Sequence, residues 1–469
     1  GVAARWLVPL LAAPHAAIAI GLAFVLAPSG WVLRLVAPVV DLAQPPATGL
    51  VNDPWGVTLI LGLMVKETPF LLLVMLAALT QIPLRQQMKA GQSLGYGSAA
   101  VWARVIVPQL WPLIRLPVMV VLAYALSVVD MALVLGPSNP PVLAVFLTRV
   151  FSAPDLALAL PASAGAVVQV LLVGVAFGIL WAAERLVARV GLWRLRSGNR
   201  GRGLEPLARL CGLGVVGLML LGVLALVALA LWSVAWRWPW PHVVPQVWSL
   251  KAWQTAGVAQ AFGQTLWLAC ATTALSVLLA ILWLEAEDRT GGRRQGWLDW
   301  VIYLPLLLPQ IGFLYGLNVL FLKVGLAGGQ MAVIWAQALF VFPYVMIALR
   351  DPWRALDPRL VRAAASLGAG PWARLWRVKL PVLLAPVLTA AAIGVAVSVA
   401  QYLPTLFMGA GRIVTLTTEA VTLSSGSDRR VTGVYATLQA MVPFAGYLAA
   451  FALPALFQRN RAALKGALR

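Results

Sequence analysis

The chain has 469 residues, of which 61% are hydrophobic and only 11% are charged, and its mean hydropathy is +0.89. A soluble domain carries roughly 25% charged and about 45–50% apolar residues. This composition excludes soluble globular domains, disordered chains and free-standing nucleic-acid binders, because none of these keeps long apolar runs. We therefore interpret the net charge of +20 as membrane topology and contact with anionic lipid, and we expect no nucleic-acid partner.

Ten apolar runs are long enough to cross the ~30 Å hydrocarbon core of a bilayer as helices. The runs are continuous, whereas the strands of a membrane barrel would alternate over ~10 residues. We therefore predict an all-α, polytopic helical membrane protein. The expected spans are residues 6–27, 55–79, 105–128, 160–185, 207–233, 259–285, 297–321, 330–350, 378–400 and 432–457.

The positive charges fall mainly on one side of this topology. The segments 80–104, 185–209, 286–296 and 350–379 and the tail after Phe457, with Arg5, hold 25 of the 35 lysines and arginines, and the opposite loops hold eight. Cytoplasmic loops of membrane proteins collect Lys and Arg. The first set of loops is therefore predicted to be cytoplasmic.

The sequence contains an internal repeat. Residues 89–108 match residues 362–381 at an offset of 273, and both copies run from Ala through Ser-Leu-Gly and Ala-Arg to an apolar ending with Pro. Both copies face the predicted cytoplasmic side, which indicates a parallel tandem repeat. Gly1 aligns opposite Gly296, so the first half is expected to lack two N-terminal helices. The predicted organisation is a first half of about four spans (1–188), a basic cytoplasmic linker (189–206) and a second half of about six spans (207–469).

The second copy has the pattern of two short helices joined by a turn. Asp357 and Pro358 predict a helix start, residues 361–367 read as a short amphipathic helix, and residues 368–371 predict a turn before a second stretch, 372–378. A short helix held between two spans could receive force from a cytoplasmic partner and pass it to the bundle.

These residues resemble the membrane subunits of binding-protein-dependent ABC importers. That family carries Glu-Ala-Ala, three residues, Gly, nine residues and then Ile-x-Leu-Pro in a cytoplasmic loop. The matching positions are Ala90, Gly95, Val105, Val107 and Pro108 in one copy and Ala363, Ala364, Gly368, Val378, Leu380 and Pro381 in the other. The family's Glu is replaced by Lys89 and Arg362, cations with which an acidic partner surface could pair.

The resemblance implies two type I ABC-importer permease halves in tandem, with each repeated loop a coupling helix docked on an ATPase subunit. It further implies two ATPase subunits that bind ATP and Mg, a solute-binding protein, and a place in the bacterial inner (plasma) membrane. The fused arrangement and residues 401–439 resemble the ferric-iron and thiamine type of double permease. The transported solute is left open by this resemblance.

No catalytic, cofactor or metal site is expected in this chain. The sequence has no GxxxxGK[ST], HExxH, GxSxG or CxxC pattern, so ATP hydrolysis would belong to a separate subunit. Two other functions stay open. A secondary transporter would move its solute without an ATPase, and a non-transporting scaffold would be indifferent to bulky substitutions at Gly95 or Gly368.

Polar groups inside or beside spans are candidates for the translocation pathway, because they are costly in a membrane. Lys66, Glu67 and Arg115 lie within spans, and Glu67 and Arg115 are predicted at similar depths, where they could pair. A pair that fixes helix packing is favoured over a gating role. Asp130 and Gln401 occupy equivalent positions in the two halves and either mark the water boundary or flank a pore mouth.

Tryptophans cluster between Trp232 and Trp248, with prolines between them. An aromatic belt at the membrane interface is the favoured interpretation, and a ligand cage is the alternative. His15 and His242 are isolated and predict no metal site.

Overall fold

The computed structural model describes residues 9–47, 49–153, 155–196, 202–290, 296–426 and 428–457. Within these ranges the protein is built from helices, with one short antiparallel pair of strands, β1 (Ala235–Arg237) and β2 (Val247–Trp248). The prediction of an all-α, polytopic membrane protein is confirmed. Long helices satisfy every backbone hydrogen bond within the segment, as the bilayer core requires.

Eight of the described helices are long and apolar enough to span a membrane, and two further pairs would each span if counted as one bent helix. We use first half and second half as names for residues 9–196 and 202–457; the predicted linker 189–206 is helical at both ends, because α10 runs to Arg196 and α11 begins at Glu205. The first half contains α2 (His15–Leu26), α3 (Trp31–Val40), α4 (Val57–Leu79), α5 (Leu84–Ser93), α6 (Ser98–Val101), α7 (Val107–Ser127), α8 (Asp130–Leu135), α9 (Leu143–Phe151) and α10 (Ala159–Arg196). The second half contains α11 (Glu205–Val234), α12 (Val258–Arg289), α13 (Gly296–Leu307), α14 (Gln310–Lys323), α15 (Gln330–Arg354), α16 (Pro358–Ser366), α17 (Pro371–Arg374), α18 (Leu380–Val382), α19 (Leu384–Ala400), α20 (Leu403–Gly409), α21 (Leu416–Ser424) and α22 (Arg429–Phe457).

Two spans that the sequence predicted as continuous are bent. The expected span 297–321 turns by 109° between α13 and α14, and the expected span 378–400 turns by 78° before α19. Pro309 stands at the first bend and caps α14. Proline has no N–H to continue the helix ladder, which explains a break at that point. The first expected span, 6–27, begins outside the described residues, and its described part is interrupted at Pro14.

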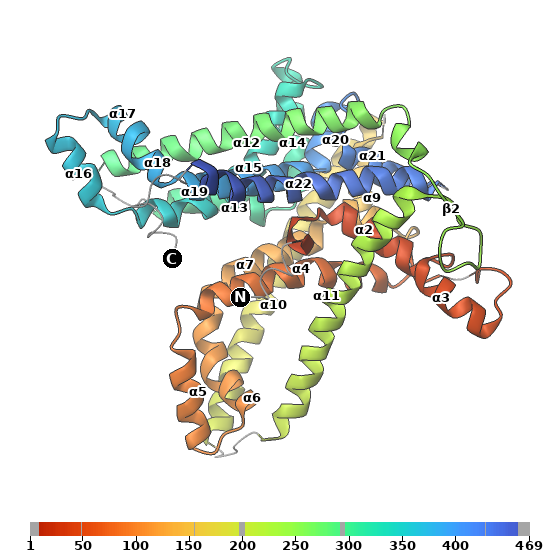
Figure 1. The fold of residues 1–469 in the computed structure, drawn as a ribbon, viewed down its shortest axis with the longest axis horizontal. Coiled ribbons are helices and arrows are strands. Elements are labelled where there is room, and N and C mark those ends of the chain that lie inside the picture. Colours follow the sequence, from red (N-terminus) through yellow and green to blue (C-terminus); the bar gives the residue numbers. More distant parts are fainter. Residues whose placement is uncertain are drawn as a thin grey trace.

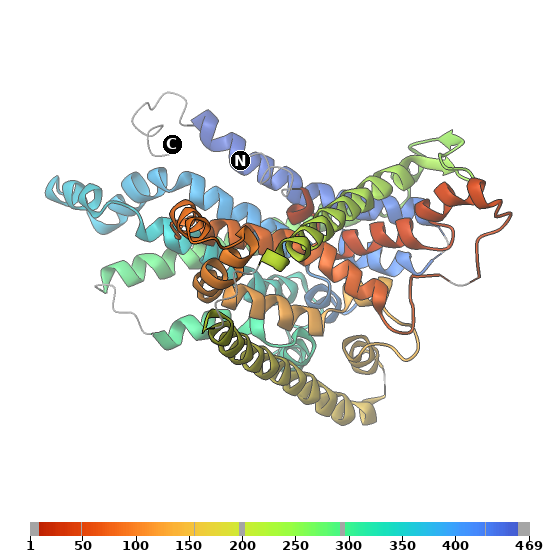
Figure 2. The same cartoon turned by 90° about the horizontal axis from the view of Figure 1, so that it is seen from below.

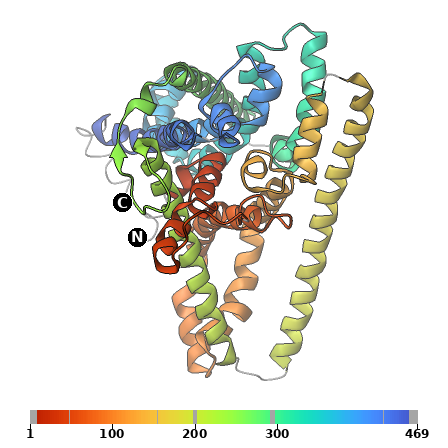
Figure 3. The ribbon, with the colours of Figure 1, turned by 90° about the vertical axis from the view of Figure 1, so that its right-hand side faces the viewer.

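The helices form two arms that diverge from a common region (Figure 1). One arm contains α5, α6, α7 and α10, and the other contains α12, α15 and α16 to α19. Seen from the side, α10 ends and α11 begins at the tip of the first arm, where α5 and α6 also lie (Figure 3). Figure 2 shows α10 along one edge of the molecule and the end of α22 on the opposite edge.

Helix α11 opens the second half in the sequence but packs against the first half. A Cβ on Gly21 of α2 would lie 2.4 Å from the carbonyl oxygen of Ala225 in α11, and one on Gly433 of α22 would lie 3.0 Å from the nitrogen of Ser233. Small residues allow such close helix contacts in membranes. The buried core that holds the common region together runs through α2, α8, α11 and α22. The two halves therefore share helices and one hydrophobic core.

The repeat seen in the sequence is also a repeat of structure. We call residues 84–108 the first repeated segment and residues 358–381 the second repeated segment. The first contains α5, α6 and a π-helical turn, η1 (Trp102–Ile106), and the second contains α16, α17 and a π-helical turn, η5 (Leu375–Lys379). The two π-helical turns begin 273 positions apart, the offset found in the sequence.

Candidate functional site

The second repeated segment folds as its sequence predicts. The Asp357 side chain accepts a hydrogen bond of 2.8 Å from the backbone N–H of Arg359, and Pro358 is the first residue of α16. Asp before Pro is a favourable helix start, because the carboxylate satisfies a free N–H and proline has none to lose. The helix ends before Gly368, whose φ is +81°.

The first repeated segment reaches the same geometry with fewer capping contacts. Pro83 precedes α5 without a side-chain cap, and Gly95, which follows the helix, has φ of +82°. A positive φ is the left-handed region that costs a residue with a Cβ about 1–2 kcal/mol. Glycine is therefore required at the same point of both copies.

The two segments present similar exposed surfaces at the ends of the two arms (Figure 1). Leu94 and Leu367, each directly before the glycine, are 67% and 88% exposed. Four other residues predicted to contact the partner are exposed, namely Lys89, Ala90, Arg362 and Ala363, and Ala364 is half-buried. Pro108 and Pro381 are each the second residue of the helix that follows. Each segment therefore presents an exposed leucine, and five residues earlier an exposed cation, Lys89 or Arg362.

The predicted pair between Glu67 and Arg115 is wrong. Glu67 Oε1 lies 2.8 Å from His15 Nε2, and Arg115 Nε lies 3.0 Å from Glu184 Oε1. Depth alone suggested the pair, but Glu67 points from α4 toward α2, whereas Arg115 points from α7 toward α10. The rotation of each helix about its own axis decided the partners.

His15 and Glu67 belong to a larger group of polar side chains in the first half, with two tyrosines of the second half in its vicinity. The ring of His15 lies 4.5 Å from the ring of Tyr124, and the Tyr124 hydroxyl lies 3.4 Å from Asp130 Oδ1. Tyr344 and Tyr402, from the second half, are within electrostatic range of Glu67 and Asp130, respectively. We call these six residues the inter-half cluster. Sequence analysis found its two carboxylates but placed His15 among isolated residues.

Lys66 is within electrostatic range of Glu67 but forms its hydrogen bonds outside the inter-half cluster. Its buried ammonium donates to the backbone carbonyls of Leu10, Leu11 and Ala13 at 3.1, 3.2 and 2.7 Å. These carbonyls precede Pro14, where the helix is interrupted. Lys66 therefore caps the carbonyl end of this helical turn, as basic residues often do. Its ammonium is satisfied by hydrogen bonds within the first half.

Asp130 and Gln401 do occupy equivalent places. Asp130 follows the long helix α7 and is the first residue of the short helix α8, and Gln401 lies between the long helix α19 and the short helix α20. Their side chains are buried, at 6% and 8% exposure, and Gln401 Oε1 has no hydrogen-bond partner among the described residues. Burial at both positions does not fit a simple water boundary.

A buried group of amides and hydroxyls near Gln401 was missed by sequence analysis. Gln337 Nε2 donates to Thr405 Oγ1 at 2.9 Å, and Ser398 Oγ donates to Gln337 Oε1 at 2.6 Å. Gln439 Nε2 donates to Thr417 Oγ1 at 2.8 Å. These side chains are neutral, whereas the predicted pathway residues other than Gln401 are charged. A glutamine in an apolar run nevertheless indicates a polar cluster, because a buried amide needs hydrogen-bond partners.

The tryptophan cluster encloses a cation of this chain. The Arg34 guanidinium lies 5.5, 5.1 and 5.6 Å from the ring centres of Trp232, Trp238 and Trp240. It also donates to the carbonyls of Pro239 and His242 at 2.9 and 3.1 Å. Trp232 is only 6% exposed. These three rings therefore join α3 to the β1–β2 connection through Arg34. They form neither the aromatic belt nor the ligand cage that the sequence suggested, because they surround an arginine of the same chain.

Close to this contact, Asp428 binds Arg430 through two hydrogen bonds of 2.9 Å. The hydrogen bonds from the Arg430 guanidinium hold the pKa of Asp428 below its ordinary value. The pair therefore keeps its charges at neutral pH.

Comparison with known proteins places these features in a family. Residues 275–459 match the model of the binding-protein-dependent transport system inner membrane component. The chain is 35% identical over 455 residues to the inner membrane ABC transporter permease protein YnjC of Escherichia coli, which covers 95% of this chain and 79% of that protein. It is 32% identical over 204 residues to the molybdenum transport system permease protein ModB of Mycobacterium tuberculosis, covering 41% of this chain and 75% of the relative. A putative 2-aminoethylphosphonate transport system permease protein, PhnV of Salmonella typhimurium, is 28% identical over 130 residues, or 27% of this chain and 49% of that protein.

Proposed function

Because the chain belongs to the family of binding-protein-dependent transport system inner membrane components, we propose that it forms the membrane pathway of an ABC importer. In this proposal the two repeated segments each dock on one ATPase subunit, which binds ATP and Mg, and a solute-binding protein delivers the solute at the opposite face. The supporting observation is the pair of matching turns, in which an exposed leucine precedes a glycine of positive φ.

The proposal places the protein in the bacterial inner membrane with the repeated segments in the cytoplasm. The excess of Lys and Arg in the loops on that side supports this orientation. Lys89 and Arg362, both exposed on the repeated segments, would meet acidic groups of the ATPase in place of the usual Glu. Lipid headgroups would contact the remaining basic loops.

The solute path in this proposal runs between the arms and passes the inter-half cluster. The cluster holds two carboxylates, Glu67 and Asp130, and three tyrosines. The cations in or beside these spans are already engaged, Lys66 by carbonyls and Arg115 by Glu184. Carboxylates and tyrosine faces attract cations, so we assign the chain to the ferric-iron and thiamine type, with a cationic solute. ModB, by contrast, is a molybdenum transport system permease protein.

A reconstitution experiment tests the importer function. The chain is purified from its native membrane with any bound ATPase, placed in liposomes, and assayed for ATP hydrolysis with and without the soluble proteins of the cell envelope. We expect an ATPase to co-purify and its activity to rise when one of these proteins is added with its solute. Uptake driven by an ion gradient without ATPase would instead establish a secondary transporter, and absence of both would indicate a scaffold.

A second experiment tests the charge of the solute. Glu67→Gln and Asp130→Asn remove the carboxylates, while Gln439→Glu changes a buried polar residue outside the inter-half cluster. Growth of cells on a panel of cationic and anionic nutrients should show loss of one cationic nutrient for the first two variants. Loss of an oxyanion nutrient instead would overturn the assignment to a cationic solute.

A further inference from the structure

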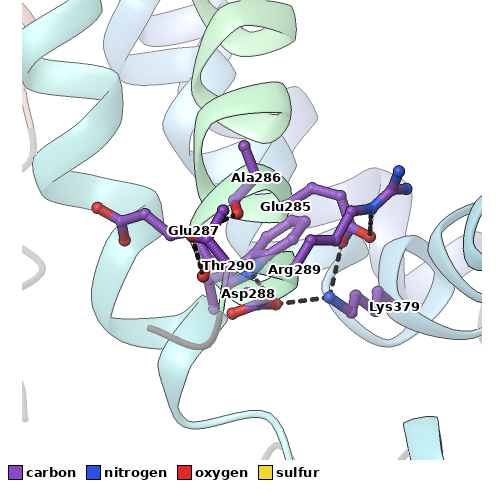
Figure 4. A network of polar contacts seen from close by, with 8 residues as sticks. Glu285, Ala286, Glu287, Asp288, Arg289, Thr290 and Lys379 are labelled. Carbon is purple, nitrogen blue, oxygen red and sulfur yellow. Dashed lines mark hydrogen bonds and ion pairs between the residues drawn. The ribbon is translucent and has the colours of Figure 1, made fainter. Parts of the chain in front are cut away.

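The second repeated segment is held by a group of charges at the end of α12. The last turns of α12 carry three acidic residues, Glu285, Glu287 and Asp288 (Figure 4). Lys379, the last residue of η5, points into this group, with Nζ 2.7 Å from Glu285 Oε2 and 2.5 Å from Asp288 Oδ2. We call Lys379, Glu285 and Asp288 the Lys379 cluster.

The Lys379 cluster is mostly buried. The side chains of Lys379 and Glu285 are 7% and 8% exposed, whereas that of Asp288 is 46% exposed. Glu285 also accepts a 3.0 Å hydrogen bond from Arg289, so both of its oxygens are used. A buried pair whose remaining hydrogen-bonding positions are satisfied holds its geometry, because separating the charges leaves one of them unpaired in an apolar setting.

The same acidic turn also holds the end of α15. The indole of Trp353 donates to Asp288 Oδ2 at 3.0 Å, and Lys379 lies 5.2 Å from the centre of the Trp353 ring. Glu287 pairs with Arg354 at 3.2 Å. Three elements, η5, α12 and α15, are therefore fastened at one point.

This point lies on the route that force would take. Helix α16 and the Gly368 turn lead through α17 and η5 into α18, and the chain then bends by 78° into α19. Because the span is bent just beyond η5, the Lys379 cluster gives a push on α16 a polar link to α12 and α15, beside the apolar packing of Leu375 in the same cluster of buried residues. π-Helical turns are often found at such functional positions.

The first repeated segment is held differently at the corresponding position. At the offset of 273, Lys379 corresponds to Ile106, which is fully buried and apolar. The first segment is instead tied to α11, since Glu205 Oε1 accepts a 2.8 Å hydrogen bond from the backbone N–H of Ala99. The two repeated segments have the same turns but contact different helices, α11 in the first case and α12 with α15 in the second.

We propose that Lys379 is a positioning residue that transmits movement of the second repeated segment to α12 and α15, and that the first repeated segment acts on α11 instead. This inference rests on the proposed importer function. The inference predicts that the two repeated segments act on different helices. When the Lys379 cluster is lost, the repeated segments should still move with the ATPase, but the second arm should no longer follow.

Two distances measured by spin labelling test this transmission without knowledge of the solute. Cys211 and Cys270 are first replaced by Ser. Labels at Arg85→Cys and Arg359→Cys, both exposed, report the distance between the repeated segments. Labels at Trp55→Cys and Met331→Cys, 87% and 62% exposed, report movement at the far end of α15.

The complex with its co-purified ATPase is measured with and without Mg-ATP. In the parent chain we expect both distance distributions to shift. In Lys379→Met the first pair should still shift and the second should not. Lys379→Arg should keep both shifts, as should Arg377→Met, a control at an exposed arginine of the same π-helical turn.

Charge exchange protects the test against a folding defect. Lys379→Glu should lose the second shift, and Lys379→Glu combined with Glu285→Lys and Asp288→Asn should recover it, because opposite charges again face each other and the new carboxylate no longer opposes that of Asp288. A second shift retained in Lys379→Met, or no recovery in the exchanged pair, overturns the inference. If the parent chain binds no ATPase, the importer function itself fails and this inference falls with it.

Discussion

Gly95 and Gly368 lie 273 positions apart and have nearly the same backbone angle, with φ of +82° and +81°. Each ends a short helix and follows an exposed leucine. The match extends through the π-helical turns that follow. Because the angles are positive in both copies, the two turns depend on the absence of a Cβ.

Gly368→Val should weaken attachment of the ATPase. The positive φ costs a side-chain-bearing residue about 1–2 kcal/mol, so the turn should rearrange rather than accept the strain. Gly370 is a matched control, because its φ is −65° and no heavy atom lies within 4 Å of a Cβ placed there. Co-purification of the ATPase should fall for Gly368→Val and stay unchanged for Gly370→Val. Equal yields from the two variants would contradict the assignment of this turn.

Leu367→Ser should reduce binding to the ATPase while leaving the stability of the isolated chain unchanged. The side chain is 88% exposed, so it contributes nothing to the core, whereas burying a leucine in an interface is worth about 1.5–3 kcal/mol. We expect a fall in affinity of at least about tenfold, measured by titration with purified ATPase.

Leu326→Ser serves as the control for Leu367→Ser. Leu326 is 51% exposed and follows α14, away from both repeated segments. An equal loss of affinity in both variants would mean that the effect comes from general surface polarity and not from docking.

Lys66→Met should destabilise the first half. The methionine fills a similar volume but leaves the carbonyls of Leu10, Leu11 and Ala13 without their donor, and each unpaired buried group costs about 1–3 kcal/mol. The melting temperature in detergent should fall clearly for Lys66→Met and little for Lys89→Met, since Lys89 is exposed. A solute path through Lys66 would instead leave the melting temperature unchanged and alter transport.

Arg34→Lys should loosen α3 from the β1–β2 connection. Lysine keeps the charge but lacks the planar group that reaches several carbonyls and stacks on rings. Limited proteolysis should cut faster between Trp238 and Val247 in this variant than in the control Arg237→Lys. Arg237 is exposed and does not lie among the three tryptophan rings that surround Arg34. Unchanged cleavage would show that the aromatic contacts alone hold the connection.

The sequence by itself determined the helical class, the approximate spans and the paired turns. These follow from local chemistry, because hydropathy over one window selects a spanning helix and glycine or Asp-Pro selects a turn whatever surrounds it. The positions of α16 and of the Gly368 turn were predictable for this reason.

Only the tertiary structure decided which side chains meet. Glu67 joins His15 and not Arg115, Arg34 enters the tryptophans, and Lys379 fastens η5 to α12. Such contacts depend on how each helix is rotated about its axis and on which helices cross, as when α11 leaves its own half to pack on α2. Because no local pattern encodes that rotation, the charges could be located along the chain in advance but their partners could not.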